Sequence, residues 1–209
     1  MRKKHPTLFL ILASTLASTL ATLPLLSFAI EPLKAKDIPA EVKPFIEPNK
    51  VAVLLNAVDL NGDGLSDFLL VLQTKSSADS QPDETVRSLL LLTRQANKSL
   101  TLAKRSDKAI LCAQCGGAFG DPLESITVGP KTFTIHHYGG SSQRWANSYK
   151  FNYSRRDNTW QLVQVDESSF NSHDPEKTAK EKTFKPPKHF GKIDFADFDP
   201  EKYLGQGEK

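Results

Sequence analysis

Oxygen-bearing side chains recur at odd positions along the segment 59–67, DLNGDGLSD. Calcium is a hard cation that takes about six to eight oxygen ligands, mainly carboxylates and carbonyls. The segment offers side chains at loop positions 1, 3, 5 and 9, and the backbone carbonyl of position 7 can add another. Three of these side chains are carboxylates, which repel one another unless a cation lies between them. The sequence therefore predicts a Ca²⁺ site formed by Asp59, Asn61, Asp63, Leu65 and Asp67.

This loop differs from the helix–loop–helix calcium motif. Leu70 occupies position 12, where that motif carries a bidentate glutamate. The flanking segments have the apolar composition of buried strands rather than of helices. We therefore expect a structural ion between two strands. The alternative is an Asp/Asn/Gly-rich turn that binds no metal.

The chain has one pair of cysteines, Cys112 and Cys115. In an oxidising compartment the simplest prediction is a local disulfide. A thioredoxin-like redox centre has the same spacing, but there the motif begins a helix after a parallel strand, whereas two glycines follow here. A zinc site completed by His136 or His137 is a further alternative. Neighbouring residues of a strand face opposite sides, so these two histidines cannot easily bind one ion together.

Glycines, aromatic residues and charges are combined in two segments, 115–123 (CGGAFGDPL) and 137–145 (HYGGSSQRW). Both are predicted to be loops at strand ends. Tyrosine, tryptophan and arginine are enriched among the residues that dominate protein interfaces, so Tyr138, Arg144 and Trp145 are candidate partner-binding residues. In the alternative interpretation the rings cap the core and the glycines satisfy tight turns.

The N-terminus has the pattern of a secretory signal peptide over residues 1–29. Three basic residues at positions 2–4 precede an apolar run from Leu8 to Leu26, and Ser27-Phe28-Ala29 supplies the small residues of a cleavage site. The alternative is an uncleaved membrane anchor, because the run is long. We expect cleavage and a periplasmic or secreted protein.

Cleavage would remove three of the 27 basic residues and leave 24 basic and 24 acidic ones. A chain without net charge has no electrostatic reason to bind nucleic acid. After residue 29 no stretch is long and apolar enough to predict a membrane span.

Apolar and alternating runs separated by turn residues predict an all-β protein with two antiparallel meanders. We expect a β-propeller-like arrangement, with a β-sandwich as the alternative. The predicted strands are Val51–Val58, Phe68–Leu72, Leu89–Leu92, Leu100–Leu102, Ile126–Val128, Phe133–His137, Tyr149–Tyr153 and Trp160–Val165.

Three other segments complete the predicted organisation. Residues 30–50 form a proline-rich lead-in with a short helical turn near Ala40–Val42, and residues 51–209 form a single domain. Within that domain, residues 167–189 are polar and are expected to be an extended surface segment. The apolar residues that follow Phe190 predict a late strand that docks on the body.

The order DLNGDGxxD, CxxCGGxFGDP, HYGGSxxRW and YxFxYSRRDxTWQLV between Val51 and Phe170 resembles a family of periplasmic bacterial proteins. Its best-known members are calcium-binding, propeller-like immunity proteins. They inhibit lysozyme-like peptidoglycan hydrolases that type IV secretion systems deliver into rival cells. The first of these motifs also resembles the calcium loop of integrin-type (FG-GAP or VCBS) repeats.

This resemblance implies a calcium-stabilised inhibitor whose partner is a peptidoglycan hydrolase. It adds Ser141 to the candidate partner-binding residues, with Tyr138 and Ser141 entering the hydrolase cleft and Arg144 pairing with a catalytic carboxylate. No catalytic constellation stands out, so we expect a binding protein rather than an enzyme. The alternatives are a structural or adhesive calcium-binding module of the cell envelope and, more remotely, a CxxC thiol oxidoreductase.

Overall fold

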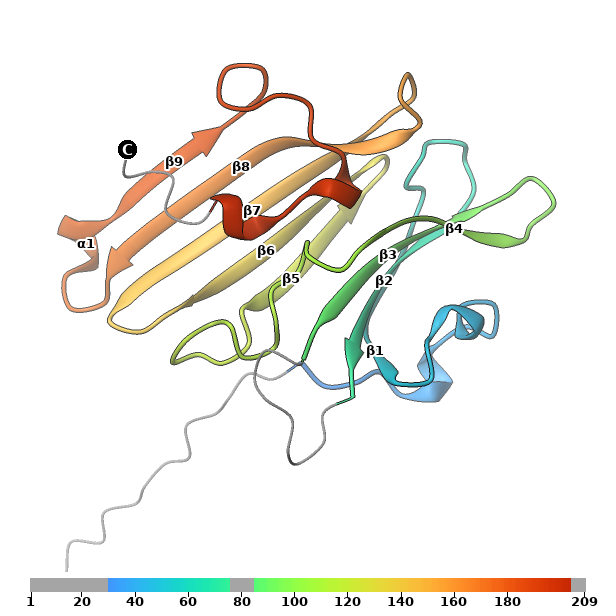
Figure 1. Cartoon of the computed structure of the whole chain (residues 1–209), viewed down its shortest axis with the longest axis horizontal. Helices are drawn as coiled ribbons and strands as arrows, with labels where there is room; N and C mark the ends of the chain where they lie inside the picture. Colours follow the sequence, from blue (N-terminus) through green and yellow to red (C-terminus); the bar gives the residue numbers. More distant parts are fainter. Residues whose placement is uncertain (1–29, 76–84, 204–209) are drawn as a thin grey trace, which may run out of the picture.

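The computed structural model describes residues 30–75 and 85–203 of the chain. The predicted signal peptide at residues 1–29 lies outside the described residues. The described chain forms two antiparallel sheets, each made of strands that are consecutive in sequence, as Figure 1 shows. The prediction of an all-β protein built from two meanders is therefore confirmed.

The first sheet (sheet A) has four strands and contains both flanks of the predicted calcium loop. Its strands lie in the order β1-β2-β3-β4. Leucine and valine fill the middle of β2 and β3, and both faces of these two strands are buried, which explains why their sequences are continuously apolar instead of alternating. The strands are β1 (Lys50–Val58), β2 (Asp67–Thr74), β3 (Arg87–Arg94) and β4 (Leu100–Ser106).

The second sheet (sheet B) has five strands, one more than predicted, in the order β5-β6-β7-β8-β9. Its β6 alternates buried and half-buried residues along its whole length, as expected for a strand with one core face. A short helix, α1 (Pro175–Thr178), connects the last two strands. The strands are β5 (Leu123–Gly129), β6 (Thr132–Gly140), β7 (Gln143–Ser154), β8 (Thr159–Asn171) and β9 (Lys180–Phe184).

The two sheets share one hydrophobic core between their facing surfaces. At one side they meet edge to edge, where β1 contacts β5 and the Asn56 amide donates a 3.4 Å hydrogen bond to the Ile126 carbonyl. At the other side they are separated, and the chain after β9 fills the space because its segment η4 (Phe195–Asp197) contacts both β4 and β8. The arrangement is thus a wedge closed at β1/β5 (Figure 1).

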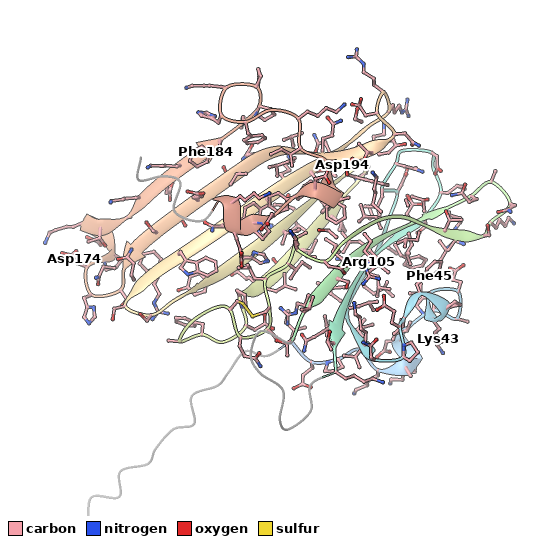
Figure 2. The ribbon with its side chains drawn as sticks, in the orientation of Figure 1. Lys43, Phe45, Arg105, Asp174, Phe184 and Asp194 are labelled. Atoms are coloured by element: carbon pink, nitrogen blue, oxygen red, sulfur yellow. A yellow bond between two sulfur atoms is a disulfide. The ribbon has the colours of Figure 1, made fainter. Side chains whose placement is uncertain are left out.

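Aromatic packing holds the C-terminal segment in this wedge. Phe195 and Phe198 are fully buried and stack in edge-to-face or tilted geometry on Phe133, Tyr149 and Phe151 of sheet B. Asp194, labelled in Figure 2, accepts hydrogen bonds from Lys104 and Thr159 and so joins both sheets. Docking of this segment was predicted correctly, but its form is two 3₁₀ turns, η4 and η5 (Pro200–Tyr203), rather than a strand.

The lead-in covers the face of sheet A that points away from sheet B. Ile38 and Val42 are buried there against leucines of β2 and β3, and the Leu33 amide donates to the Ala52 carbonyl at 2.8 Å. Its helical turns are η1 (Ala35–Asp37) and η2 (Lys43–Phe45), which flank the predicted position near Ala40–Val42. The proline-rich lead-in is therefore part of the core.

A buried ion pair connects sheet A to the start of sheet B. The Arg87 guanidinium on β3 donates to both carboxylate oxygens of Asp121, at 2.6 and 2.5 Å, and these side chains are 0% and 2% exposed. Gln73 accepts two further hydrogen bonds from Arg87, and the Leu123 amide donates to Asp121. Because a bidentate pair with two further hydrogen bonds has a fixed geometry, it sets where β5 begins relative to β3.

Replacement of Asp121 by alanine should destabilise the protein by about 3–5 kcal/mol, because it leaves the Arg87 charge buried without a carboxylate. The free energy of unfolding from denaturant titration measures the effect. Glu41→Ala is the matched control: it removes a bidentate arginine partner, that of Arg94, at a site where the carboxylate is 43% exposed. It should change stability little, and equal losses in the two variants would contradict the role of the buried pair.

Candidate functional site

The segment 59–67 forms a tight loop in which side chains of the predicted ligands bind backbone amides of the same loop. The Asp59 carboxylate accepts hydrogen bonds from the amides of Gly62, Asp63 and Gly64 at 2.6–3.2 Å. The Asn61 amide donates to the Asp63 carboxylate at 2.9 Å. Gly62 and Gly64 have φ angles of +77° and +86°, a left-handed conformation that side chains other than glycine rarely adopt.

Asp67 differs from the other predicted ligands because it is completely buried. Its carboxylate oxygens accept one hydrogen bond each from the backbone amides of Leu60 and Arg94, both at 2.8 Å. Burial raises the pKa of this carboxyl group, the two backbone hydrogen bonds oppose the increase, and the charges of Asp63 and Asp59 add to it. Asp67 therefore fastens the loop to β3.

The loop also joins the two sheets, which the sequence did not reveal. The Trp160 indole of β8 donates to the Leu60 carbonyl at 2.8 Å, and the Lys131 amide in the β5–β6 turn donates to the Asp59 carbonyl at 2.9 Å. Arg155 donates to the Gly62 carbonyl at 3.1 Å. A cation in this loop would thus stabilise the contact between sheets as well as the β1–β2 hairpin.

Within residues 30–75 and 85–203, no group of three or more His, Cys, Asp or Glu side chains has the arrangement of a metal centre. The loop carboxylates bind backbone amides instead. A carboxylate offers about four lone-pair sites, so each of these groups retains acceptor capacity. The composition of the loop suits a hard cation, and calcium binding stays a prediction.

Cys112 and Cys115 form a disulfide bond, in agreement with the prediction. Residues 113–116 after the first cysteine form turns, and Cys115 is exposed. A thioredoxin-like centre would need a helix at this point. The disulfide instead closes the bend before the glycines of the segment 116–122.

The structure brings together the two glycine- and aromatic-rich segments that the sequence singled out. Gly117 bridges to Gly140, the Ala118 amide donates to the Gly140 carbonyl, and the Gly140 amide donates to the Gly116 carbonyl. A side chain at Gly117 would lie 3.0 Å from the Gly140 carbonyl oxygen, so the close approach requires glycine. We call residues 116–122 and 138–145 together the hairpin end of sheet B.

Three side chains stack at the hairpin end. The Arg144 guanidinium lies 3.8 Å from the centre of the Phe119 ring, and Phe119 contacts Tyr138 edge to face at 5.3 Å. Such a cation–π contact holds the guanidinium in place, and its Nη1 atom is buried without a hydrogen-bond partner among the described residues. Ser141, Ser142 and Gln143 are exposed at the tip.

Trp145 lies on the other face of the same hairpin. Its partner across the strands is Gly139, and a Cβ atom at Gly139 would lie 2.5 Å from the indole ring. The indole therefore occupies the space that the glycine leaves open. The four candidate partner-binding residues thus fall into two groups, with Tyr138, Ser141 and Arg144 at the tip and outer face, and Trp145 on the inner face.

A groove on this inner face contains functional candidates that sequence analysis missed. It has a volume of about 930 Å³, and Trp145, Asn147, Glu167, Lys180 and Lys182 are among the residues that line it. Asn147 stands directly opposite Glu167, which stands opposite Lys182. The sequence does contain a signal for this groove. Asn147 is a polar residue on the same strand face as Tyr149, where the alternation of apolar and polar residues predicts burial.

Two histidines occupy opposite faces of β6, as predicted. His136 on the outer face lies 2.8 Å from the Ser148 hydroxyl and 3.1 Å from that of Thr127. The partner of the His136 Nε2 atom is thus the Thr127 hydroxyl and not a carboxylate. Thr127, His136 and Ser148 therefore form a ladder of polar side chains across three neighbouring strands. His137 is 1% exposed, and neither ring nitrogen has a hydrogen-bond partner among the described residues.

Comparisons of the chain with protein-family models, with curated proteins and with solved structures give no match. In the described part of the chain, no helix has the length and apolar character needed to cross a bilayer. The functional argument therefore rests on the geometry of the hairpin end, the loop 59–67 and the groove.

Stability should fall on acidification because of His137. Burial lowers the pKa of this histidine to about 3, and the nearby Arg87 charge contributes. Between about pH 6.5 and pH 3 the unfolded chain binds a proton that the folded protein excludes, so stability rises with pH in this window, with a slope of up to about 1.4 kcal/mol per pH unit.

His137→Phe removes this titration and should flatten the dependence of unfolding free energy on pH between 6.5 and 3. The phenyl ring can make the same aromatic contact with Tyr149. The replacement removes no hydrogen bond seen among the described residues. His173→Gln, at an exposed histidine, is the control and should keep the wild-type slope. Parallel profiles for the wild type and His137→Phe would refute the assignment.

Proposed function

We propose that this chain is an exported, calcium-stabilised binding protein that inhibits a lysozyme-like peptidoglycan hydrolase through the hairpin end of sheet B. The observation that carries the proposal is the Gly117–Gly140 contact, which joins two segments distant in sequence into one surface. That surface combines a narrow exposed tip at Ser141 with a guanidinium fixed on an aromatic ring at Arg144.

The chemistry of the tip suits such a partner. Glycoside hydrolases of this kind act with two carboxyl groups that flank the scissile bond in a cleft. A projecting turn of small residues can enter a cleft, and Tyr138 beside it adds aromatic contact area. The Arg144 guanidinium supplies the positive charge that complements a catalytic carboxylate.

In this proposal calcium has a structural role at the opposite end of sheet B. The loop 59–67 binds the turn at Lys131 and the side chain of Trp160, so an ion there would stabilise the contact between sheets and, through it, the hairpin end. The wedge of two open meanders suits a β-sandwich-like arrangement better than a propeller-like one, because the sheets face each other across one core.

The protein, purified after export, should slow the clearing of a peptidoglycan suspension by a lysozyme-like hydrolase. Candidate targets are lysozymes of different structural types and any hydrolase encoded beside this gene. Ser141→Glu should raise the inhibitor concentration needed for half inhibition at least tenfold, because a negative charge would face the catalytic carboxylates. Arg156→Glu, exposed in the turn between β7 and β8, is the control for charge and should inhibit like the wild type.

Lack of inhibition of every hydrolase by the wild type would reject the inhibitor proposal. Equal inhibition by the Ser141→Glu variant and the wild type would reject the hairpin end as the contact surface.

Calcium should raise the melting temperature of the wild type by several degrees and a chelator should lower it, because an ion that binds only the folded state stabilises that state. Asp63→Ala should melt at a lower temperature than the wild type, and added calcium should not restore it. Asp197→Ala, at an exposed aspartate outside the loop, should retain the calcium response. If the melting temperature of the wild type changes neither with added calcium nor with a chelator, the calcium site is refuted.

A further inference from the structure

The groove on the inner face of sheet B lies beyond the part of that face covered by sheet A. The C-terminal segment fills the wedge over Tyr149 and Phe151. The groove begins at Asn147, two residues before Tyr149 on β7. Its volume of about 930 Å³ is within the range of small-molecule sites. The hairpin tip and α1 lie at the same end of sheet B, where Asp174 is labelled in Figure 2.

An aromatic platform forms one part of the groove. Trp145 is half-buried, and its indole is backed by the Gly139 backbone. A ring supported on one side in this way presents its other face to a ligand without losing side-chain freedom on binding. Flat apolar faces of this kind pack well against the C–H faces of ring-shaped ligands.

Beside the platform lies a buried polar floor. Asn147 is 5% exposed, and one carboxylate oxygen of Glu167 is buried without a hydrogen-bond partner among the described residues. Burial raises the pKa of Glu167, and the Lys182 charge opposes this. Since an unpaired buried polar atom is destabilising, the floor is suited to a ligand that carries hydroxyl or amide groups.

Basic side chains outnumber acidic ones around the groove, with Arg144, Lys177, Lys180 and Lys182 against Glu167 and Glu201. Lys180 and Lys182 of β9 line it, and neither forms an ion pair among the described residues. Lys177 of α1 also lines it but is paired with Asp174 at 3.2 Å. Two unpaired ammonium groups next to a polar floor favour a ligand with a negative charge at one end.

We propose that this groove binds a carboxylate-bearing saccharide. One sugar ring stacks on Trp145, its hydroxyl or amide groups bond to Asn147 and Glu167, and its carboxylate pairs with Lys180 and Lys182. The buried Glu167 disfavours a polyphosphate or nucleic acid, which carries several negative charges, more than it disfavours a ligand with a single carboxylate. Arg144 borders both this groove and the hairpin end, whereas Tyr138 and Ser141 do not line the groove. The Ser141 variant and the lysine variants below therefore distinguish loss of hydrolase inhibition from loss of saccharide binding.

Binding can be followed by tryptophan fluorescence, because the chain has two tryptophans and the other, Trp160, is 2% exposed in the core. The probes are the disaccharide of N-acetylglucosamine and N-acetylmuramic acid, digalacturonic acid, and the neutral disaccharide of N-acetylglucosamine, which lacks a carboxylate. Saturable binding of either acidic probe, at least tenfold tighter than the neutral one, is expected. The tighter of the two acidic probes identifies the source of the carboxylate, cell-wall glycan or uronate polymer.

The double variant Lys180→Gln/Lys182→Gln should bind the acidic probe at least tenfold more weakly and the neutral probe unchanged. Lys150→Gln, at an exposed lysine of β7, should bind both like the wild type. Trp145→Ala should bind neither the acidic nor the neutral probe in calorimetry. Its circular dichroism spectrum should be the same as that of the wild type. The proposal is overturned if no saccharide binds at millimolar concentration, if the lysine variant binds as the wild type does, or if an acidic peptide binds more tightly than every saccharide.

Discussion

The buried pair of Arg87 and Asp121 is the constraint on which the arrangement of the two sheets depends. Each sheet is a self-contained meander of sequential hairpins, so local pairing alone does not fix one sheet relative to the other. The ion pair does this at the point where the chain passes from sheet A to β5. Because desolvation opposes the burial of charges, the main contribution of such a pair is the defined geometry that it imposes rather than a net gain in stability.

That geometry leaves both faces of sheet B accessible for the two proposed sites at its free end. The outer side carries Phe119 stacked between Tyr138 and Arg144, and the inner side carries Trp145 on Gly139. Glycines permit both: one glycine pair lets the 116–122 segment approach β6, and Gly139 makes room for the indole. In the two proposals, the tip of this hairpin contacts a protein and its inner face binds a saccharide, with Arg144 at the border between them.

Sequence analysis identified the strands correctly where burial determines the order of apolar and polar residues. The apolar run Leu89–Leu92 and the alternation Tyr149–Tyr153 identified their strands correctly. It missed β9, whose charged sequence pairs with β8 at an edge and needs no apolar pattern. It also missed Glu167 as a groove residue, because a register shift between Lys150 and Phe151 decides which residues of β8 share a face with Trp145. The meeting of the two glycine-rich segments is a tertiary contact that no local propensity encodes.

The charged edge strand β9 has a consequence for self-association. An exposed edge can pair with the same edge of another molecule and start aggregation. In Lys180-Glu181-Lys182 the charges alternate symmetrically about the glutamate. An antiparallel pairing of two copies centred there would set lysine opposite lysine and glutamate opposite glutamate, and like charges directly opposite are destabilising. The edge of sheet B thus resists the growth of a continuous sheet between molecules.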